Sequence, residues 1–91
     1  MSKTILRHQM SVEDSPKHIT VRGDAKIIHC AEDRQGFGRI DIWVEIENDM
    51  RQPEHYICLM IFGTGYTIPN DVEHVQTVVM SDGFVWHIYK Q

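Results

Sequence analysis

The sequence lacks the features that mark several large classes of protein. No apolar run approaches the ~20 residues that a transmembrane helix needs, and residues 1–8 turn polar after two aliphatic residues, unlike a signal peptide. Cysteine is scarce, because Cys30 and Cys58 are the only two, and they form no Cys-x-x-Cys pair. We therefore expect a cytoplasmic protein without membrane contact. Both cysteines are interpreted as small buried hydrophobic residues, with a disulfide or a reactive thiol as the alternatives.

An excess of positive charge is also missing. Nine Lys and Arg residues oppose thirteen Asp and Glu residues, and the net charge is −4. General binding to nucleic acid or to an anionic membrane needs a basic surface, so neither is expected. The 91 residues are 42% hydrophobic and 24% charged, an ordinary globular mixture for one small domain. We predict a single domain over residues 1–91.

The sequence does contain repeated alternation of apolar and polar residues. In residues 39–47, four aliphatic residues alternate with charged residues and Trp43, as in a strand with one buried face. Similar patterns predict strands over residues 4–10, 17–22, 25–32, 39–47, 54–62, 72–80 and 84–90. Residues 33–38 form a predicted hairpin connection, and residues 71–76 are the best site for a short helical turn. The pattern predicts an all-β fold, a small antiparallel barrel or sandwich of six to seven strands.

Two predicted strands carry more specific expectations. Strict alternation over residues 25–32 places Ile27 and His29 on one face and Ile28 and Cys30 on the other. Residues 54–62 are apolar on both faces, so this strand is placed centrally and covered on each side.

The last two strands form the strongest local signal. Ser81-Asp82-Gly83 joins them, and Asp-Gly is the preferred pair for a tight type I′ turn. With Asp82-Gly83 as a two-residue loop, Val79 faces Trp86, Val78 faces His87 and Gln76 faces Tyr89.

Four segments carry a family resemblance. They are Ala25-Lys26-Ile27-Ile28-His29, Ile42-Trp43, Phe62-Gly63-Thr64-Gly65-Tyr66-Thr67-Ile68-Pro69 and Val85-Trp86-His87-Ile88-Tyr89. Together they resemble a family of uncharacterised proteins of this length that is common in bacteriophages and their bacterial hosts. The resemblance implies a small phage accessory protein in the cytoplasm of an infected bacterium, and it brings no assigned catalytic residue. Proteins of that setting are often counter-defence factors, which bind a host protein or sequester a host signalling molecule.

The Phe62-Gly63-Thr64-Gly65 segment is the first candidate for a binding site. Two glycines let a backbone approach a ligand closely, and consecutive N–H groups can form a nest for an anion, with the Thr64 hydroxyl as a further donor. The segment is no Walker loop, because it lacks the lysine and the following helix. The alternative is a plain turn that uses glycine for a positive φ.

Aromatic residues are the second candidate. Trp43 lies on the charged side of its strand, and it is interpreted as an interface residue, a stacking platform or a locally packed residue. His87 and Tyr89 form a row that could stack a flat ligand, whereas Trp86 is interpreted as a core residue.

Catalysis and metal binding find little support. The six histidines show no His-x-x-x-His spacing, so neither a metal site nor a cofactor is predicted. Cys30 and Cys58 fall within apolar strands, where thiols are usually inert. Asp41 and Glu45 are interpreted as surface charges on a solvated face. We predict no enzyme and no catalytic residue.

The sequence therefore predicts a non-catalytic binding protein of counter-defence type that sequesters a small anionic, nucleotide-derived signalling ligand. A homo-oligomer is expected, because a chain this small has limited concave surface and a second subunit would complete the pocket. One alternative is an inhibitor that binds a host defence protein through an exposed aromatic and acidic face around Trp43. Another is a structural accessory protein of a phage. The predicted ligand contacts are Gly63, Thr64, Gly65, Tyr66, Trp43, His29 and His87.

Overall fold

A computed structural model describes residues 2–35 and 38–91, so Gly36 and Phe37 of the predicted connection lie outside the described residues. The strands are β1 (Lys3–Ser11), β2 (Lys17–Arg22), β3 (Lys26–Glu32), β4 (Arg39–Glu47), β5 (Glu54–Gly63), β6 (Glu73–Val79) and β7 (Val85–Lys90). The predicted all-β class is confirmed. The predicted helical turn was wrong in position, because the 3-10 turn η1 spans Val12–Asp14 and residues 73–76 belong to β6. Within the described residues no helix is long and apolar enough to span a membrane.

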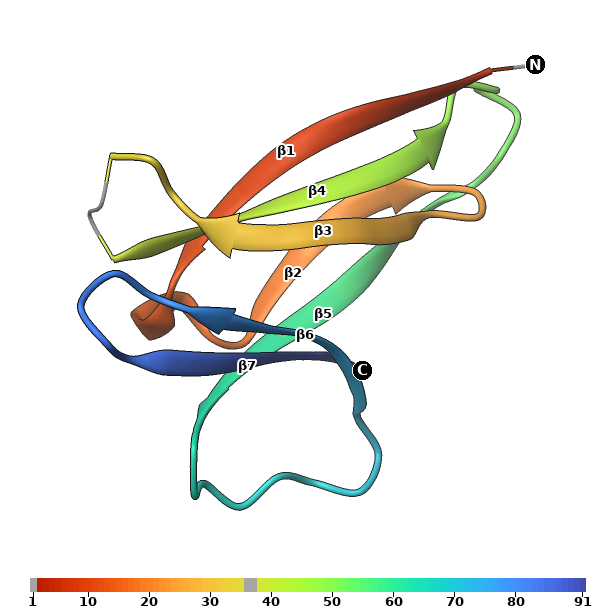
Figure 1. Ribbon diagram of the computed structural model, residues 1–91. Coiled ribbons are helices and arrows are strands. Elements are labelled where there is room, and N and C mark those ends of the chain that lie inside the picture. The colour runs from red at the N-terminus through yellow and green to blue at the C-terminus, as the bar shows by residue number, and fades with distance from the viewer. Residues whose placement is uncertain (1, 36–37) are drawn as a thin grey trace.

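The strands form two antiparallel sheets that lie face to face (Figure 1). Sheet A has the order β1-β4-β3, and sheet B has the order β2-β5-β7-β6. The sheets share no strand and do not close on each other, so the structure is a sandwich and not a barrel. Inward side chains of both sheets build the core: Met10, Ile19, Val21, Cys30, Ile40, Ile42, Val44, Leu59, Ile61, Val78, Met80 and Ile88.

A β-bulge changes the faces of β3. The register against β4 shifts between Ile27 and His29, so that Ile27 pairs with Val44 and Cys30 pairs with Ile42. Ile27 and Cys30 therefore both face the core. The predicted strict alternation was wrong here, because a bulge inserts one unpaired residue and reverses the order of faces beyond it.

The β6–β7 hairpin also has a different register from the predicted one. The Met80 N–H donates to the Phe84 carbonyl at 2.8 Å, which leaves three residues in the loop. Gly83 occupies the left-handed position with φ +91°, as three-residue hairpin loops require. Val78 consequently pairs with Trp86, and Thr77 pairs with His87. The shift by one residue places Trp86 on the inner face of sheet B and His87 on the outer face.

Strand β5 is central, as predicted, because it lies between β2 and β7. The predicted cover on both faces was wrong. Its inner face packs into the core through Leu59 and Ile61, but its outer face is open to solvent, and Tyr56 there is 70% exposed.

One side chain fastens the two sheets together along an edge. The Gln76 amide of β6 accepts from the Cys30 backbone N–H at 2.7 Å and donates to the Cys30 carbonyl at 2.6 Å. Gln76 thereby pairs with the backbone of β3, which is the edge strand of sheet A. At the end of the same edge, the Glu32 carboxylate accepts from the backbone N–H of Ser81 at 2.7 Å and from its hydroxyl at 2.7 Å.

We expect Gln76→Ala to lower the free energy of unfolding by about 2–4 kcal/mol, because it removes two hydrogen bonds and leaves two partly buried backbone groups without a partner. Urea unfolding at neutral pH measures the change. Gln52→Ala is the matched control, since Gln52 is exposed and its replacement should change stability by less than ~0.5 kcal/mol. Equal stability of the two variants would contradict the role assigned to Gln76.

We expect His8 to make folding sensitive to pH. It lies on the inner side of β1, and its Nε2 atom is buried with no hydrogen-bond partner in the described part of the chain. Burial, and secondarily the positive charge of Lys17, lower the pKa of His8 from its usual value. In the unfolded chain a histidine has a pKa of ~6.5. As the pH falls, residue 8 of the unfolded chain is therefore protonated at a higher pH than His8 of the folded chain.

The stabilising effect of neutral His8 is present above the unfolded pKa and is lost as the pH falls through the lowered folded pKa. We expect the urea midpoint to fall between about pH 7.5 and about pH 5, and to fall less in His8→Gln. An identical pH dependence of the two proteins would show that His8 does not contribute.

Candidate ligand-binding site

A glycine turn follows the end of β5. The Tyr66 N–H donates to the Gly63 carbonyl at 3.1 Å, and Gly65 between them has φ +90°. A positive φ at the third position is typical of a type II turn. The interpretation of this segment as a turn that needs glycine is therefore confirmed.

Gly63 allows two aromatic rings to approach the backbone. A Cβ atom at this position would lie 3.0 Å from Cε1 of Tyr66 and 3.4 Å from Cζ3 of Trp86. A side chain at residue 63 would therefore push the Tyr66 ring away. Glycine at this position keeps the rings of Tyr66 and Trp86 against the end of β5.

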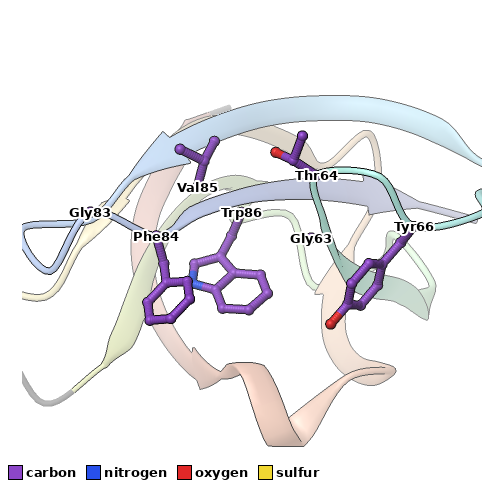
Figure 2. Close-up of a pocket in the computed structure, with 7 residues that line it drawn as sticks. All are labelled: Gly63, Thr64, Tyr66, Gly83, Phe84, Val85 and Trp86. Atoms are coloured by element: carbon purple, nitrogen blue, oxygen red, sulfur yellow. The ribbon is translucent and has the colours of Figure 1, made fainter.

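The β6–β7 hairpin supplies the rest of the site. The rings of Phe84 and Trp86 are stacked, with centroids 5.8 Å apart and an interplanar angle of 24°. Figure 2 shows that the side chains of Phe84, Trp86 and Tyr66 point to the same side, whereas Thr64 and Val85 point to the other. Phe84 is 61% exposed and Tyr66 is 63% exposed, so both rings are available to a ligand.

These residues surround a hollow of about 330 Å³, which we call the aromatic cleft. It is lined by Gly63, Thr64, Tyr66, Gly83, Phe84, Val85 and Trp86. Among the described residues, none that lines the cleft is charged. Its chemistry therefore favours the flat face of an uncharged ring over a phosphate or a carboxylate.

A second hollow shares Phe84 and Trp86 with the aromatic cleft. It measures about 310 Å³ and is lined by Val12, Glu13, Gly38, Met80, Asp82, Phe84 and Trp86. Two of these residues, Glu13 and Asp82, are acidic. The stacked aromatic pair therefore borders both an uncharged hollow and one with two acidic residues in its lining.

The Thr64 hydroxyl lies on the outer face of sheet B, where it is hydrogen-bonded to a neighbouring side chain. Thr64 Oγ1 and His87 Nε2 are 2.9 Å apart, and His87 Nδ1 lies 2.9 Å from Oγ1 of Thr77. His74 Nε2 continues this row at 3.0 Å from the same Thr77 oxygen. The Thr64 side chain thus orients His87 on the outer face of sheet B and points away from the aromatic rings.

The structure brings only part of the predicted contact set together. Gly63, Thr64, Gly65 and Tyr66 form the turn beside the aromatic cleft, and His87 contacts this turn through Thr64. Trp43 and His29 lie on the outer face of sheet A, where their ring centroids are 5.6 Å apart.

The surroundings of Trp43 differ from the predicted solvated acidic face. Asp41 is only 2% exposed, so its interpretation as a surface charge was wrong. It accepts a hydrogen bond from Gln9 at 2.8 Å and lies 3.9 Å from Arg7. Glu45 lies 3.4 Å from the Lys3 ammonium. Lys3 and Arg7 therefore offset the charge of the acids beside Trp43, and Gln9 donates a hydrogen bond to one of them.

Phe84 was missed from the sequence, and Trp86 was assigned to the core alone. Trp86 does pack against the core, and it also lines the cleft. A signal for both residues was present in the sequence. Reading Ser81-Asp82-Gly83 as a three-residue loop with glycine in the left-handed position would have put Trp86 beside Val78.

The two thiols differ in environment. Cys30 is buried and Cys58 is half-buried, and both are free. Burial raises the pKa of the Cys30 thiol to about 11. Across residues 2–35 and 38–91, no three His, Cys, Asp or Glu side chains converge on a point where a metal ion could bind.

Comparison with known families gives one match. A family model with the description "domain of unknown function (DUF7352)" matches residues 1–91. The expected membership of an uncharacterised family is thereby confirmed. No curated protein and no solved structure matches the chain.

We expect a thiol reagent at about pH 8 to modify Cys30 at least ~10-fold more slowly than Cys58, because a thiol with so high a pKa is almost entirely protonated there. Absorbance of the released reporter group gives both rates. In Cys30→Ala the fast phase should remain, and in Cys58→Ala it should disappear. Loss of the fast phase in Cys30→Ala would contradict the assignment.

Proposed function

The chain belongs to the DUF7352 family, and we propose that it is a non-catalytic binding protein that captures a nucleotide-derived ligand by stacking the ligand's base in the aromatic cleft. The observation that carries the proposal is the arrangement of Tyr66, Phe84 and Trp86 around one hollow. The Tyr66 ring from the turn after β5, the Phe84 ring from the β6–β7 loop and the Trp86 ring from β7 converge there, and the first two are more than half exposed. Aromatic rings held in this way provide a stacking platform for a planar group.

The size of the cleft supports a ligand that inserts one ring. Its volume of about 330 Å³ lies at the lower end of the ~300–1,000 Å³ that small-molecule pockets span. A single nucleobase therefore fits better than a whole dinucleotide. Stacking of a base on aromatic side chains contributes ~1–3 kcal/mol per base.

The charge of the cleft indicates which part of a nucleotide is recognised. The lining supplies the Tyr66 hydroxyl, backbone groups and ring faces, and in the described chain it supplies no Lys or Arg. A phosphate would therefore remain at the open mouth, beside the backbone of the Gly63–Tyr66 turn. The base is the recognised part of the anionic ligand in this proposal.

The proposal also includes the cell in which the protein would act. A cytoplasmic phage protein that captures a nucleotide-derived signal would lower the free concentration of that signal in an infected bacterium, which is a counter-defence activity. The inhibitor alternative receives less support, because Trp43 packs against His29 and its acidic neighbours are paired with basic or amide groups.

The first test is a titration followed by the fluorescence of Trp86 in a Trp43→Phe background. We expect adenosine and AMP to quench this fluorescence with similar dissociation constants and inorganic phosphate to leave it unchanged. Phe84→Ala should weaken binding by ~5-fold to ~150-fold, which corresponds to the loss of one stacking contact.

Tyr56→Ala is the matched control, because it removes a similarly exposed ring from outside the cleft, and it should bind as the parent does. The nucleosides of guanine, cytosine and uracil complete the set of probes. Absence of quenching by all four nucleosides, or quenching by phosphate alone, would overturn the proposal.

A further inference from the structure

The outer surface of sheet B is a second feature that a single chain leaves uncovered. We call the outward surface of β2, β5, β7 and β6 the sheet B face. Its apolar and aromatic members are Tyr56, Met60, Phe62, Val79, Val85 and Tyr89. Tyr56 and Val79 are each 70% exposed. We propose that the sheet B face is the interface of a symmetric homodimer, in which it packs against the same face of a second copy of this chain.

The first support comes from the composition of β5. Strands that are apolar on both faces are typical of positions covered on both sides. The inner face of β5 packs against sheet A, but the outer residues Tyr56, Cys58, Met60 and Phe62 contact no second layer of the chain. A second copy on this face would give β5 the cover that its sequence indicates.

The second support comes from the polar groups of the face, which bond to one another. Thr64, His87, Thr77 and His74 form a continuous row with separations of 2.9–3.0 Å. The polar atoms in this row already have partners, so covering them removes fewer bonds to water. The desolvation of the face is therefore less unfavourable than the number of its histidines and threonines alone would indicate.

Ring contacts on the face also reduce the side-chain conformational entropy that would be lost on dimerisation. Tyr89 is held between Phe62 and His74, with centroid separations of 5.5 Å and 5.2 Å, both edge to face. His18 and Tyr56 make a third edge contact at 6.2 Å. Side chains that are already packed lose less rotamer freedom when a partner binds.

Charge favours a second copy as the occupant. The chain has a net charge of −4, so most surfaces of two copies repel each other. On the sheet B face, the ionised side chains among the described residues are Arg22 and Glu54, which pair at 2.8 Å at one end. A neutral face is the surface through which two like-charged copies approach without repulsion, and a two-fold axis brings identical faces together.

The outer face of sheet A lacks these properties. Lys3 lies within 4 Å of Glu45 and of Glu47, and Arg7 lies 3.9 Å from Asp41. Burying this charged surface against a second copy would remove several ionised groups from water. The two faces of the sandwich are therefore different, and only sheet B offers an apolar surface of low charge.

The size of the face sets the expected strength of the dimer. Four strands at ~4.8 Å spacing and about six residues along each strand give roughly 400 Å² in projection for one copy. Two copies would bury at least ~800 Å², which is below the ~1,600 Å² of a standard stable interface. We therefore expect a dimer with a dissociation constant in the micromolar range.

Dimerisation and ligand capture use different sides of the hairpin. Figure 2 shows the rings of Phe84, Trp86 and Tyr66 pointing away from the side on which Val85 lies, and Val85 belongs to the sheet B face. A partner on that face leaves the rings of the aromatic cleft accessible. The dimer can therefore exist whether or not the cleft binds a nucleotide.

Sedimentation velocity across a concentration series from about 1 μM to about 500 μM tests the proposal, since this range brackets a micromolar dissociation constant. The parent protein should pass from monomer to dimer within the series. Val79→Glu and Tyr56→Glu place like charges on both copies of the interface, and each should raise the dissociation constant at least tenfold. Both residues are largely exposed, so the thermal midpoint should change little.

Ile5→Glu is the matched control. It puts the same charge on a half-exposed aliphatic residue, 52% exposed, on the outer face of sheet A, and it should leave the dimer unchanged. Cys58 gives an independent readout, because its modification rate in Cys30→Ala should fall as the protein concentration rises through the dissociation constant. A parent protein that stays monomeric throughout, or a dimer lost in Ile5→Glu but kept in Val79→Glu, would overturn the proposal.

Discussion

The pairing of one glutamine side chain with one backbone position holds the sandwich in its observed arrangement. The sheets share no strand, so their relative position depends on contacts between layers. Apolar packing is tolerant of small shifts, whereas the two hydrogen bonds between Gln76 and Cys30 require one register of β6 against β3. Both strands are irregular near this contact: the register of β3 shifts between Ile27 and His29, and that of β6 shifts between His74 and Gln76. The bulges direct Gln76 inward and leave the edge of β3 free to receive it.

The aromatic cleft depends on that edge. Strand β6 determines where β7 lies, and β7 carries Trp86 directly after the loop that presents Phe84. Ser81 in the same loop is held by Glu32 at the end of β3. The stacked rings are therefore positioned by hydrogen bonds at two points along one edge of the sandwich, and the Gly63–Tyr66 turn closes the cleft from the other side.

Much of the fold could be predicted from alternation, because one buried face imposes a period of two on a strand. The bounds of β2 and β4 agree with the prediction to the residue, and the others agree within one residue at each end. Alternation does not reveal insertions. The bulge in β3 shifts the pairing of that strand by one residue, and the three-residue loop that ends at Gly83 shifts the pairing of β6 with β7 by one residue. In both places the inner and outer residues beyond the shift are exchanged relative to the prediction. The predicted cover of β5 on both sides was wrong for one chain, because composition shows how apolar a face is and not which molecule covers it.

The candidate site was less accessible to sequence reasoning, because strand order decides which loops meet. Nothing in alternation shows that β5 lies beside β7, and this pairing brings Gly63 opposite Trp86. The same order puts Trp43 and His29 in the other sheet, far from the turn with which they were grouped. The sequence allowed a chemical role to be assigned to each segment by itself. The strand order was needed to show which segments lie together.

The Phe84–Trp86 pair borders two hollows of unlike charge, and under the proposed function this difference would constrain the orientation of a bound nucleotide. In the hollow lined by Glu13 and Asp82 a phosphate would meet two carboxylates, while in the aromatic cleft it would meet the Tyr66 hydroxyl and backbone groups. If a base stacked on these rings, its phosphate would meet less repulsion in the aromatic cleft than in the hollow lined by Glu13 and Asp82. Under the proposed function, repulsion would therefore disfavour reversed binding, and this selection would weaken as added salt screens the acids.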